Sequence, residues 1–141
     1  MPIDSMMLMD KFTSGQKYVK ALETLLENPA SNFCLDFDLQ LKGERILEVL
    51  VQIMLDVCTH IVANSLEPAP ESYADCFRRL VSIDVLSETL GEKSVGIVKM
   101  RNLVSHQYGI IDYNLLYAGL EELQTIFKEY QQAILSWIEM K

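Results

Sequence analysis

The 141-residue chain has few residues that break regular structure or cross-link a fold. It contains four prolines, six glycines and three cysteines. So few turn-forming residues fit poorly with a disordered chain, a collagen-like chain or a turn-rich all-β fold. Half of the residues are hydrophobic, enough for a core that buries roughly two thirds of the unfolded surface. The composition therefore predicts one helical domain spanning residues 1–141.

The cysteines and histidines give no sign of a disulfide framework or a metal site. Cys34, Cys58 and Cys76 form no C-x-x-C pair and are odd in number, which suits neither disulfides nor zinc. The two histidines, His60 and His106, are too few for a His-rich metal site. We therefore expect reduced, mostly buried thiols, no metal and no cofactor.

Long apolar runs are also missing. Glu48, Gln52 and Asp56 interrupt the most apolar stretch, so no uninterrupted run approaches the roughly 20 residues of a membrane-spanning helix. The short apolar run at residues 6–9 follows Asp4 and lacks the basic flank of a signal peptide. These absences predict a cytoplasmic protein without a membrane span.

The formal net charge of -8 is unevenly distributed. Residues 21–76 carry ten acidic and two basic side chains, whereas the rest of the chain is balanced. Residues 91–110 are locally basic because Lys93, Lys99 and Arg101 outnumber one acidic residue. An acidic chain should repel nucleic acid, but a small basic patch can bind a polyanion locally. The charge pattern alone is equally consistent with a solvated helix face.

Apolar periodicity predicts two helices in the first part of the chain. Apolar or small residues from Leu8 to Leu26 recur in steps of three and four, and the pattern ends before Pro29. A second helix follows Asp38 as its expected N-cap and has two neighbouring apolar stripes. A helix that is apolar on two sides needs two packing partners, which suggests a homodimer. The stripes are Leu47, Leu50, Met54, Val57 and Ile61, and Val51, Leu55, Cys58 and Val62.

Three more helices are predicted further along. A short helix covers about residues 72–81 and a longer one about 84–106. The last helix follows Asp112 as N-cap, and its apolar residues alternate steps of three and four from Tyr113 to Trp137. The predicted fold is an all-α, antiparallel up-and-down bundle of four long helices and one short helix.

The chain lacks phosphate-loop, dinucleotide-binding, hydrolase-elbow and zincin motifs. Its most reactive side chains lie in the segment R-N-L-V-S-H-Q-Y, residues 101–108. Arg101 offers a fixed charge with a fork that fits phosphate, and His106 exchanges protons near neutral pH. Such a pair can catalyse RNA transesterification, which needs charge stabilisation and proton transfer but no metal. By spacing alone, however, an Arg–His pair at a helix end is more often a structural cap than a catalytic pair.

The spacing of this pair limits what one helix can do. On an ideal helix Arg101 and His106 are about 140° apart. Either the helix loosens near His106, or two chains contribute their pairs to one cleft. Ser105 adjoins His106 but lacks the acid and the sharp turn of a serine hydrolase. We expect structural roles for His60 and for Tyr73, Tyr113 and Tyr130.

The segment 101–108 resembles the R-x4-H-x-Y motif of the HEPN superfamily, in the form found in HepT-like toxins of HEPN/minimal nucleotidyltransferase (MNT) pairs. The resemblance extends over most of the chain. Gly43 and Gln52 depart from it, since relatives often have alanine and an acid there, and Gly43 is expected to mark a frayed helix start. The matching framework is Glu44 with Arg45, residues 55–57 with His60 and Ile61, residues 72–77 with Leu80, and residues 109–112.

The resemblance implies a homodimeric, metal-independent endoribonuclease, the toxin of a type VII toxin–antitoxin system acting on RNA such as tRNA or mRNA. Arg101 would bind the scissile phosphate, His106 would be the general acid-base and Asn102 would help to hold the site. Tyr108 would be the tyrosine that the partner MNT antitoxin AMPylates to silence the toxin. One alternative is a catalytically inactive helical subunit that binds a nucleotidyltransferase and contributes nucleotide or substrate contacts. Another is a purely structural dimerisation module.

Overall fold

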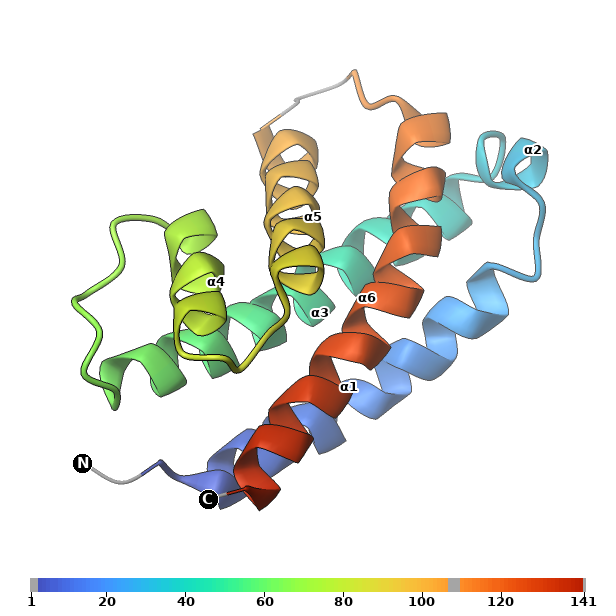
Figure 1. Ribbon diagram of the computed structural model, residues 1–141. Helices are drawn as coiled ribbons and strands as arrows, with labels where there is room; N and C mark the ends of the chain where they lie inside the picture. Colours follow the sequence, from blue (N-terminus) through green and yellow to red (C-terminus); the bar gives the residue numbers. More distant parts are fainter. Residues whose placement is uncertain (1–2, 107–109, 141) are drawn as a thin grey trace.

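The computed structural model describes residues 3–106 and 110–140, and this part of the chain forms six helices and no strand (Figure 1). The four long helices and the short α4 confirm the predicted all-α bundle. The one-turn helix α2 was not predicted, since four residues are too few to show a periodicity. The helices are α1 (Ser5–Leu25), α2 (Ala30–Phe33), α3 (Phe37–Ala63), α4 (Tyr73–Ser82), α5 (Glu88–His106) and α6 (Tyr113–Glu139).

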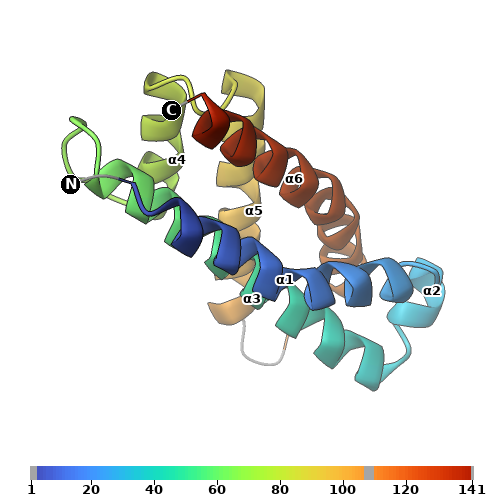
Figure 2. The same ribbon diagram turned by 90° about the horizontal axis from the view of Figure 1, so that it is seen from below.

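The helices form two groups on the central helix α3. In Figures 1 and 2, α1 and α6 lie along one side of the molecule, and α4 and α5 stand together on the other. The long helix α3 contacts both groups. Because α4 and α5 pack against each other and both pack against α3, the end of α5, where the motif lies, is fixed relative to α4.

Both apolar stripes of α3 are buried within the single chain. None of their nine side chains is more than 1 % exposed, because α1, α4, α5 and α6 all pack against this helix. The two-sided apolar pattern therefore gives no support for a homodimer, because helices of the same chain cover both sides, and the homodimer stays a prediction.

By length and composition, α3 is the one helix among the described residues that could cross a membrane. This differs from the expectation that polar interruptions leave no such segment. Glu48, Gln52 and Asp56 are four residues apart and thus share one face of the helix, which leaves the other faces of this stretch largely apolar. The apolar side chains of α3 form the protein core, and a buried core helix passes the same test as a membrane span.

Two predicted helix starts need correction. Asp36, rather than Asp38, caps α3, since its side chain accepts a hydrogen bond from Leu39 N. The helix α5 begins at Glu88 rather than near Asp84, because Asp84 has a positive φ of 61°, which does not fit a right-handed helix. The predicted cap Asp112 is confirmed, with its carboxylate accepting from Asn114 N and Leu115 N.

Gly43 lies inside α3 and does not mark a frayed start. A Cβ at this position would approach Leu120 Cδ1 and Phe33 Cε2 to 3.0 Å each. Such a distance is tighter than ordinary van der Waals contact, so α2 and α6 can pack this closely on α3 only over a residue without a side chain. The cost of glycine in the helix is thus offset by closer packing.

Several polar side chains have the structural roles that were expected. The hydroxyl of Tyr130, fully buried, donates to the Met54 carbonyl at 2.8 Å. His60 Nε2 accepts a hydrogen bond from Asp4 N at 3.0 Å. Tyr113 packs edge-on against Phe33.

Candidate active site

Arg101 is anchored near the end of α5 by contacts to α3 and to its own neighbour. Its Nη1 donates to Gln52 Oε1 at 3.1 Å, and its Nη2 donates to Asn102 Oδ1 at 3.4 Å. Both Arg101 and Asn102 are half-buried. The guanidinium is therefore held in one place while part of it stays accessible to an anion.

Tyr73, the first residue of α4, is a further neighbour of Arg101, besides Gln52 and Asn102. The Arg101 guanidinium carbon lies 6.0 Å from the centroid of the Tyr73 ring, and Tyr73 is 50 % exposed. A cation over an aromatic face is attracted by the ring. The expectation that Tyr73 has only a packing role is wrong, because its side chain is half exposed, whereas Cys76, Phe77 and Leu80 occupy the buried face of α4.

Gln52 is itself fixed by a polar chain that runs from α1 to α5. Its Nε2 donates to Asp56 Oδ1 at 2.9 Å, and Lys11 Nζ contacts Asp56 Oδ2 at 3.0 Å. The sequence showed Gln52 only as a departure from the family pattern. Its spacing of four residues from Asp56 was the signal that the two share a helix face.

His106 is the last residue of α5 and is exposed. No hydrogen bond, ion pair or ring contact involves its imidazole in the described part of the chain. Because α5 is helical through His106, the helix does not loosen before this residue. The structure thus groups Arg101 with Asn102, while His106 lies exposed at the end of the helix.

The predicted modification site Tyr108 lies outside the described residues, as do Gln107 and Gly109. Among the residues that are described, no group of three or more His, Cys, Asp or Glu side chains could hold a metal ion. The functional groups named so far at this site are the guanidinium of Arg101, the amides of Gln52 and Asn102, the phenol of Tyr73 and the imidazole of His106.

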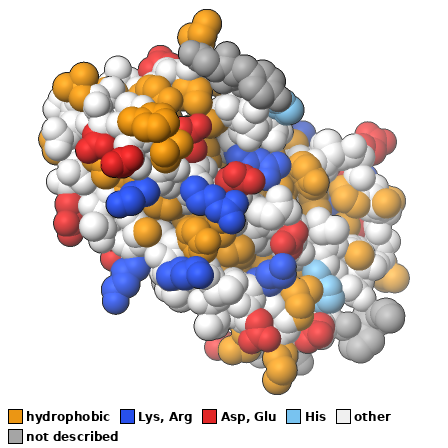
Figure 3. Space-filling model, turned by 180° about the vertical axis from the view of Figure 1, so that it is seen from behind, with side chains coloured by type: hydrophobic (Ala, Val, Ile, Leu, Met, Phe, Trp, Pro, Cys, Tyr) orange, Lys and Arg blue, Asp and Glu red, His pale blue; other side chains and the backbone are white. Residues whose placement is uncertain are grey.

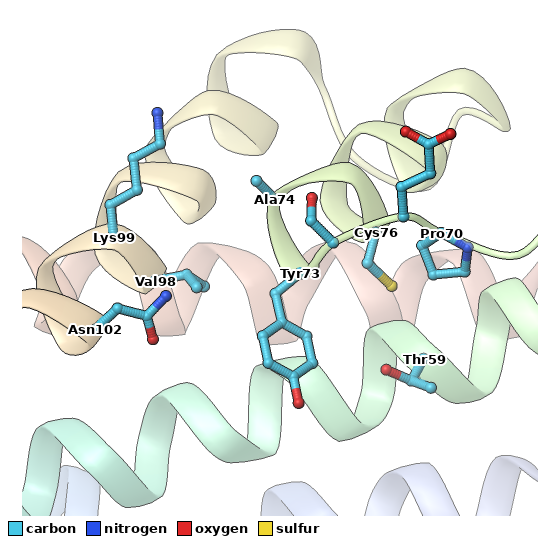
Figure 4. Close-up of a pocket in the computed structure, with 10 residues that line it drawn as sticks. Thr59, Pro70, Tyr73, Ala74, Cys76, Val98, Lys99 and Asn102 are labelled. Atoms are coloured by element: carbon cyan, nitrogen blue, oxygen red, sulfur yellow. The ribbon is translucent and has the colours of Figure 1, made fainter. Parts of the chain in front are cut away.

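A cavity of about 540 Å³ adjoins Arg101 between α3, α4 and α5 (Figure 4). Figure 4 shows the Tyr73 ring between the amide of Asn102 and the hydroxyl of Thr59. The cavity belongs to neither α4 nor α5 alone, and it was not predicted. Its lining residues are Thr59, Pro70, Glu71, Ser72, Tyr73, Ala74, Cys76, Val98, Lys99 and Asn102.

The start of α4, which places Tyr73, is fixed by reciprocal hydrogen bonds. Ser72 Oγ accepts from Asp75 N at 3.0 Å, and Asp75 Oδ2 accepts from Glu71 N at 3.0 Å. Arg79 Nη2 also contacts Asp75 Oδ2, at 3.1 Å. The Glu71 hydrogen bond and then Arg79 lower the pKa of Asp75, because both favour the charged carboxylate.

Two thiols lie in the core between α3 and α4. The sulfur atoms of Cys58 and Cys76 are 2.6 Å apart, and both residues are buried and free. Burial raises the pKa of Cys58, whereas the hydrogen bond from Cys58 lowers that of Cys76. Cys34 is half-buried and free. The expectation of mostly buried thiols is thus confirmed for Cys58 and Cys76, and their reduced state stays a prediction.

Lys and Arg side chains gather across the middle of the face seen in Figure 3, around an apolar area. The chain as a whole carries a net charge of -8. Acidic side chains also lie among these basic groups on the same face, so any attraction of a polyanion there acts only at short range.

Comparison with known proteins identifies the family. Residues 15–134 match the ribonuclease HepT-like family. The Bacillus subtilis (strain 168) protein called "Putative RNase YutE" is 26 % identical over 100 residues, which cover 71 % of this chain and 69 % of that protein.

Solved structures share the fold. One is a tri-AMPylated Shewanella oneidensis HEPN toxin in complex with MNT antitoxin, with a TM-score of 0.83 at 19 % identity over 92 % of this chain and 96 % of that chain. Another is the Bacillus subtilis cytosolic protein YutE, with a TM-score of 0.84 at 20 % identity over 98 % of this chain and 92 % of that chain. A toxin–antitoxin crystal structure with AMP-PNP gives 0.83 at 19 % identity, covering 92 % and 97 %. The chain has the HEPN fold and belongs to the ribonuclease HepT-like family.

Proposed function

We propose that this protein is a metal-independent endoribonuclease, the cytoplasmic toxin of a HEPN/MNT pair, and that Arg101 and His106 carry its chemistry. The observation that carries the proposal is the anchored guanidinium of Arg101, held by Gln52 beside Asn102, on the same helix as an exposed His106. Membership of a ribonuclease family supports this reading of the two groups.

In the proposed reaction, the 2'-hydroxyl of a ribose attacks the adjacent phosphorus. The hydroxyl proton passes to an imidazole, and the bond from phosphorus to the 5'-oxygen breaks. That oxygen receives a proton from an imidazolium, which leaves a 2',3'-cyclic phosphate and a 5'-hydroxyl. Arg101 stabilises the added negative charge of the transition state, and Asn102 keeps Arg101 in position.

The reaction needs a proton acceptor and a proton donor on opposite sides of the phosphate. One chain supplies a single motif histidine, at the exposed end of α5. A homodimer in which two α5 ends face each other would supply two imidazoles and two guanidinium groups to one cleft. We therefore propose that the active unit is a homodimer and that its substrate is RNA.

The proposed partner is a minimal nucleotidyltransferase antitoxin that AMPylates Tyr108. The phenol oxygen of Tyr108 would attack the α-phosphorus of ATP and lose its proton, with pyrophosphate leaving. The solved fold relative from Shewanella oneidensis is a tri-AMPylated toxin in complex with its MNT antitoxin. A phosphate-bearing adduct seven residues from Arg101 in the chain can occupy the place of the substrate phosphate.

Growth of cells on induced expression tests the proposal. We expect the wild type to arrest growth and Arg101→Ala to relieve the arrest. Arg78→Ala is the matched control, because Arg78 forms only an exposed ion pair with Glu92 at 3.4 Å, and it should arrest growth as the wild type does.

Equal arrest by Arg101→Ala would contradict the proposed role of Arg101. No arrest by the wild type, together with a stable complex with a minimal nucleotidyltransferase, would instead favour a non-catalytic binding subunit. Mass spectrometry tests the partner separately, since incubation with that enzyme and ATP should add AMP to the wild type and not to Tyr108→Phe.

A further inference from the structure

We infer that the cavity between α3, α4 and α5 is a nucleobase subsite, which takes one base of the RNA next to the phosphate bound by Arg101. In this subsite the base stacks on Tyr73 and its edge is hydrogen-bonded by Asn102. The inference rests on the proposed nuclease function, because it takes Arg101 as the phosphate anchor.

The cavity and the anchor are continuous. Tyr73 and Asn102 both line the cavity, and both also contact Arg101, Tyr73 through its ring and Asn102 through its Oδ1. A phosphate on the outer side of the guanidinium therefore has its neighbouring nucleoside beside the cavity mouth. The same two side chains would contact the base and position the phosphate anchor.

The lining has the groups that recognise a base. Tyr73 offers an aromatic ring that is half exposed, and every base can stack on such a ring. The amide of Asn102 has both donors and an acceptor, which suits the edge of a base, and Thr59 adds a hydroxyl. The volume of about 540 Å³ lies in the range of sites for small organic ligands, about 300–1,000 Å³.

The lining does not suit a purely anionic ligand. Lys99 is the one basic residue of the lining and Glu71 its one acidic residue, so the charged residues of the lining sum to zero. Pro70, Ala74 and Val98 add apolar surface. In Figure 4 the amine of Lys99 extends away from the Tyr73 ring, where it can contact the next phosphate of a strand. An uncharged planar base with flanking phosphates fits this arrangement.

The test is the binding of the four homodinucleotides of DNA, each with one phosphate and no 2'-hydroxyl to react. Affinities are measured by NMR titration of the full chain. We expect Tyr73→Ala to weaken binding of at least one dinucleotide by about 5- to 150-fold, the loss that corresponds to one base stacked on an aromatic ring. Tyr73→Phe, which keeps the ring, should bind as the wild type does.

Inorganic phosphate is the second probe, because it needs Arg101 and no base subsite. Because Tyr73 also contacts Arg101, Tyr73→Ala should weaken phosphate binding by a much smaller factor than it weakens dinucleotide binding, and circular dichroism should show an unchanged melting temperature. Equal loss of phosphate and dinucleotide affinity would overturn the inference, since Tyr73 would then act only by holding Arg101. Equal dinucleotide affinity in the wild type and Tyr73→Ala would overturn it as well.

The binding and cleavage experiments together show whether the subsite or the nuclease proposal has failed. If Tyr73-dependent dinucleotide binding is found but RNA is not cleaved, the subsite is supported and the nuclease proposal fails. If RNA is cleaved equally well by the wild type and Tyr73→Ala, with equal dinucleotide affinities, the nuclease proposal is retained and the subsite is overturned.

Discussion

Arg101 and Gln52, 49 residues apart in the sequence, are joined by a hydrogen bond of 3.1 Å from Nη1 to Oε1. This bond ties the end of α5 to the middle of α3. Since Gln52 is neutral, it orients the guanidinium without neutralising it. The full charge of Arg101 thus stays available to a phosphate.

Gln52→Ala should reduce nuclease activity without unfolding the protein. The loss of one hydrogen bond to a charged group near the surface predicts a fall in kcat/KM of about tenfold. The free energy of unfolding should change by less than about 0.5 kcal/mol, because Gln52 is exposed. Kinetics of RNA cleavage and urea denaturation measure the two effects.

The matched control is Gln16→Ala. It removes an exposed glutamine that is hydrogen-bonded to Gln131, a contact between α1 and α6 that does not involve Arg101. It should have the kinetics of the wild type. Wild-type kcat/KM in Gln52→Ala would show that Arg101 does not depend on this contact.

Two glycines of α5 allow packing to be separated from helix propensity. A Cβ at Gly91 would overlap Val81 Cγ2, whereas a Cβ at Gly96 would meet nothing within 4 Å. Gly96→Ala should stabilise the protein by about 0.5–1 kcal/mol. Gly91→Ala changes the helix propensity in the same way. The Gly91→Ala protein should nevertheless have a free energy of unfolding about 1–3 kcal/mol lower than the Gly96→Ala protein, because the added methyl group overpacks the contact of α5 with α4. Equal unfolding free energies for the two variants would contradict this close contact.

The start of α4 should show a specific pH dependence. The pKa of Asp75 is lowered in the folded state from its ordinary value of 3.8, so its stabilising contribution is complete above that value. It is lost as the pH falls below about 4 and through the lowered folded value. Asp75→Asn should therefore lower stability at neutral pH and flatten its fall in acid.

Thermal unfolding from pH 7 to pH 2 checks this, with the exposed Asp10→Asn on α1 as the matched control. Parallel stability curves for wild type and Asp75→Asn at all pH values would be inconsistent with the role of Asp75.

The three thiols should differ in reactivity. Cys58 and Cys76 are buried, whereas Cys34 is half-buried, and the raised pKa of Cys58 keeps it as an unreactive thiol. An aromatic disulfide reagent should modify one thiol per native chain quickly and the remainder only on unfolding. Cys34→Ser should remove the fast phase, and a fast phase in that variant would contradict the burial of the other two.

Most of the fold could be predicted because its signals are local. Spacings of three and four residues mark the buried faces of α1, α3 and α6, and Asp112 is an N-cap recognisable from neighbouring residues. The start of α5 was misplaced because the positive φ of Asp84 has no unambiguous sign in the sequence. The two-sided apolar pattern of α3 was misread because periodicity shows that a face is buried but not which chain buries it.

The candidate site was predicted only in part, for a related reason. Arg101, Asn102 and His106 stand within one short segment, so a motif reveals all three. Gln52 and Tyr73 come from other helices and meet Arg101 only through the packing of α3 and α4 against α5. No local pattern shows that Tyr73, next to the cap Ser72, is exposed beside a cavity.

The most direct measurement is RNA cleavage by the purified protein in EDTA, with analysis of the product ends. We predict 2',3'-cyclic phosphate and 5'-hydroxyl ends from the wild type, and a rate about 10²- to 10⁴-fold lower for His106→Ala with an unchanged melting temperature. His60→Ala, which alters the other histidine of the chain, should cleave as the wild type does. Cleavage by His106→Ala at the wild-type rate, or a wild-type activity that EDTA abolishes, would contradict the proposed mechanism.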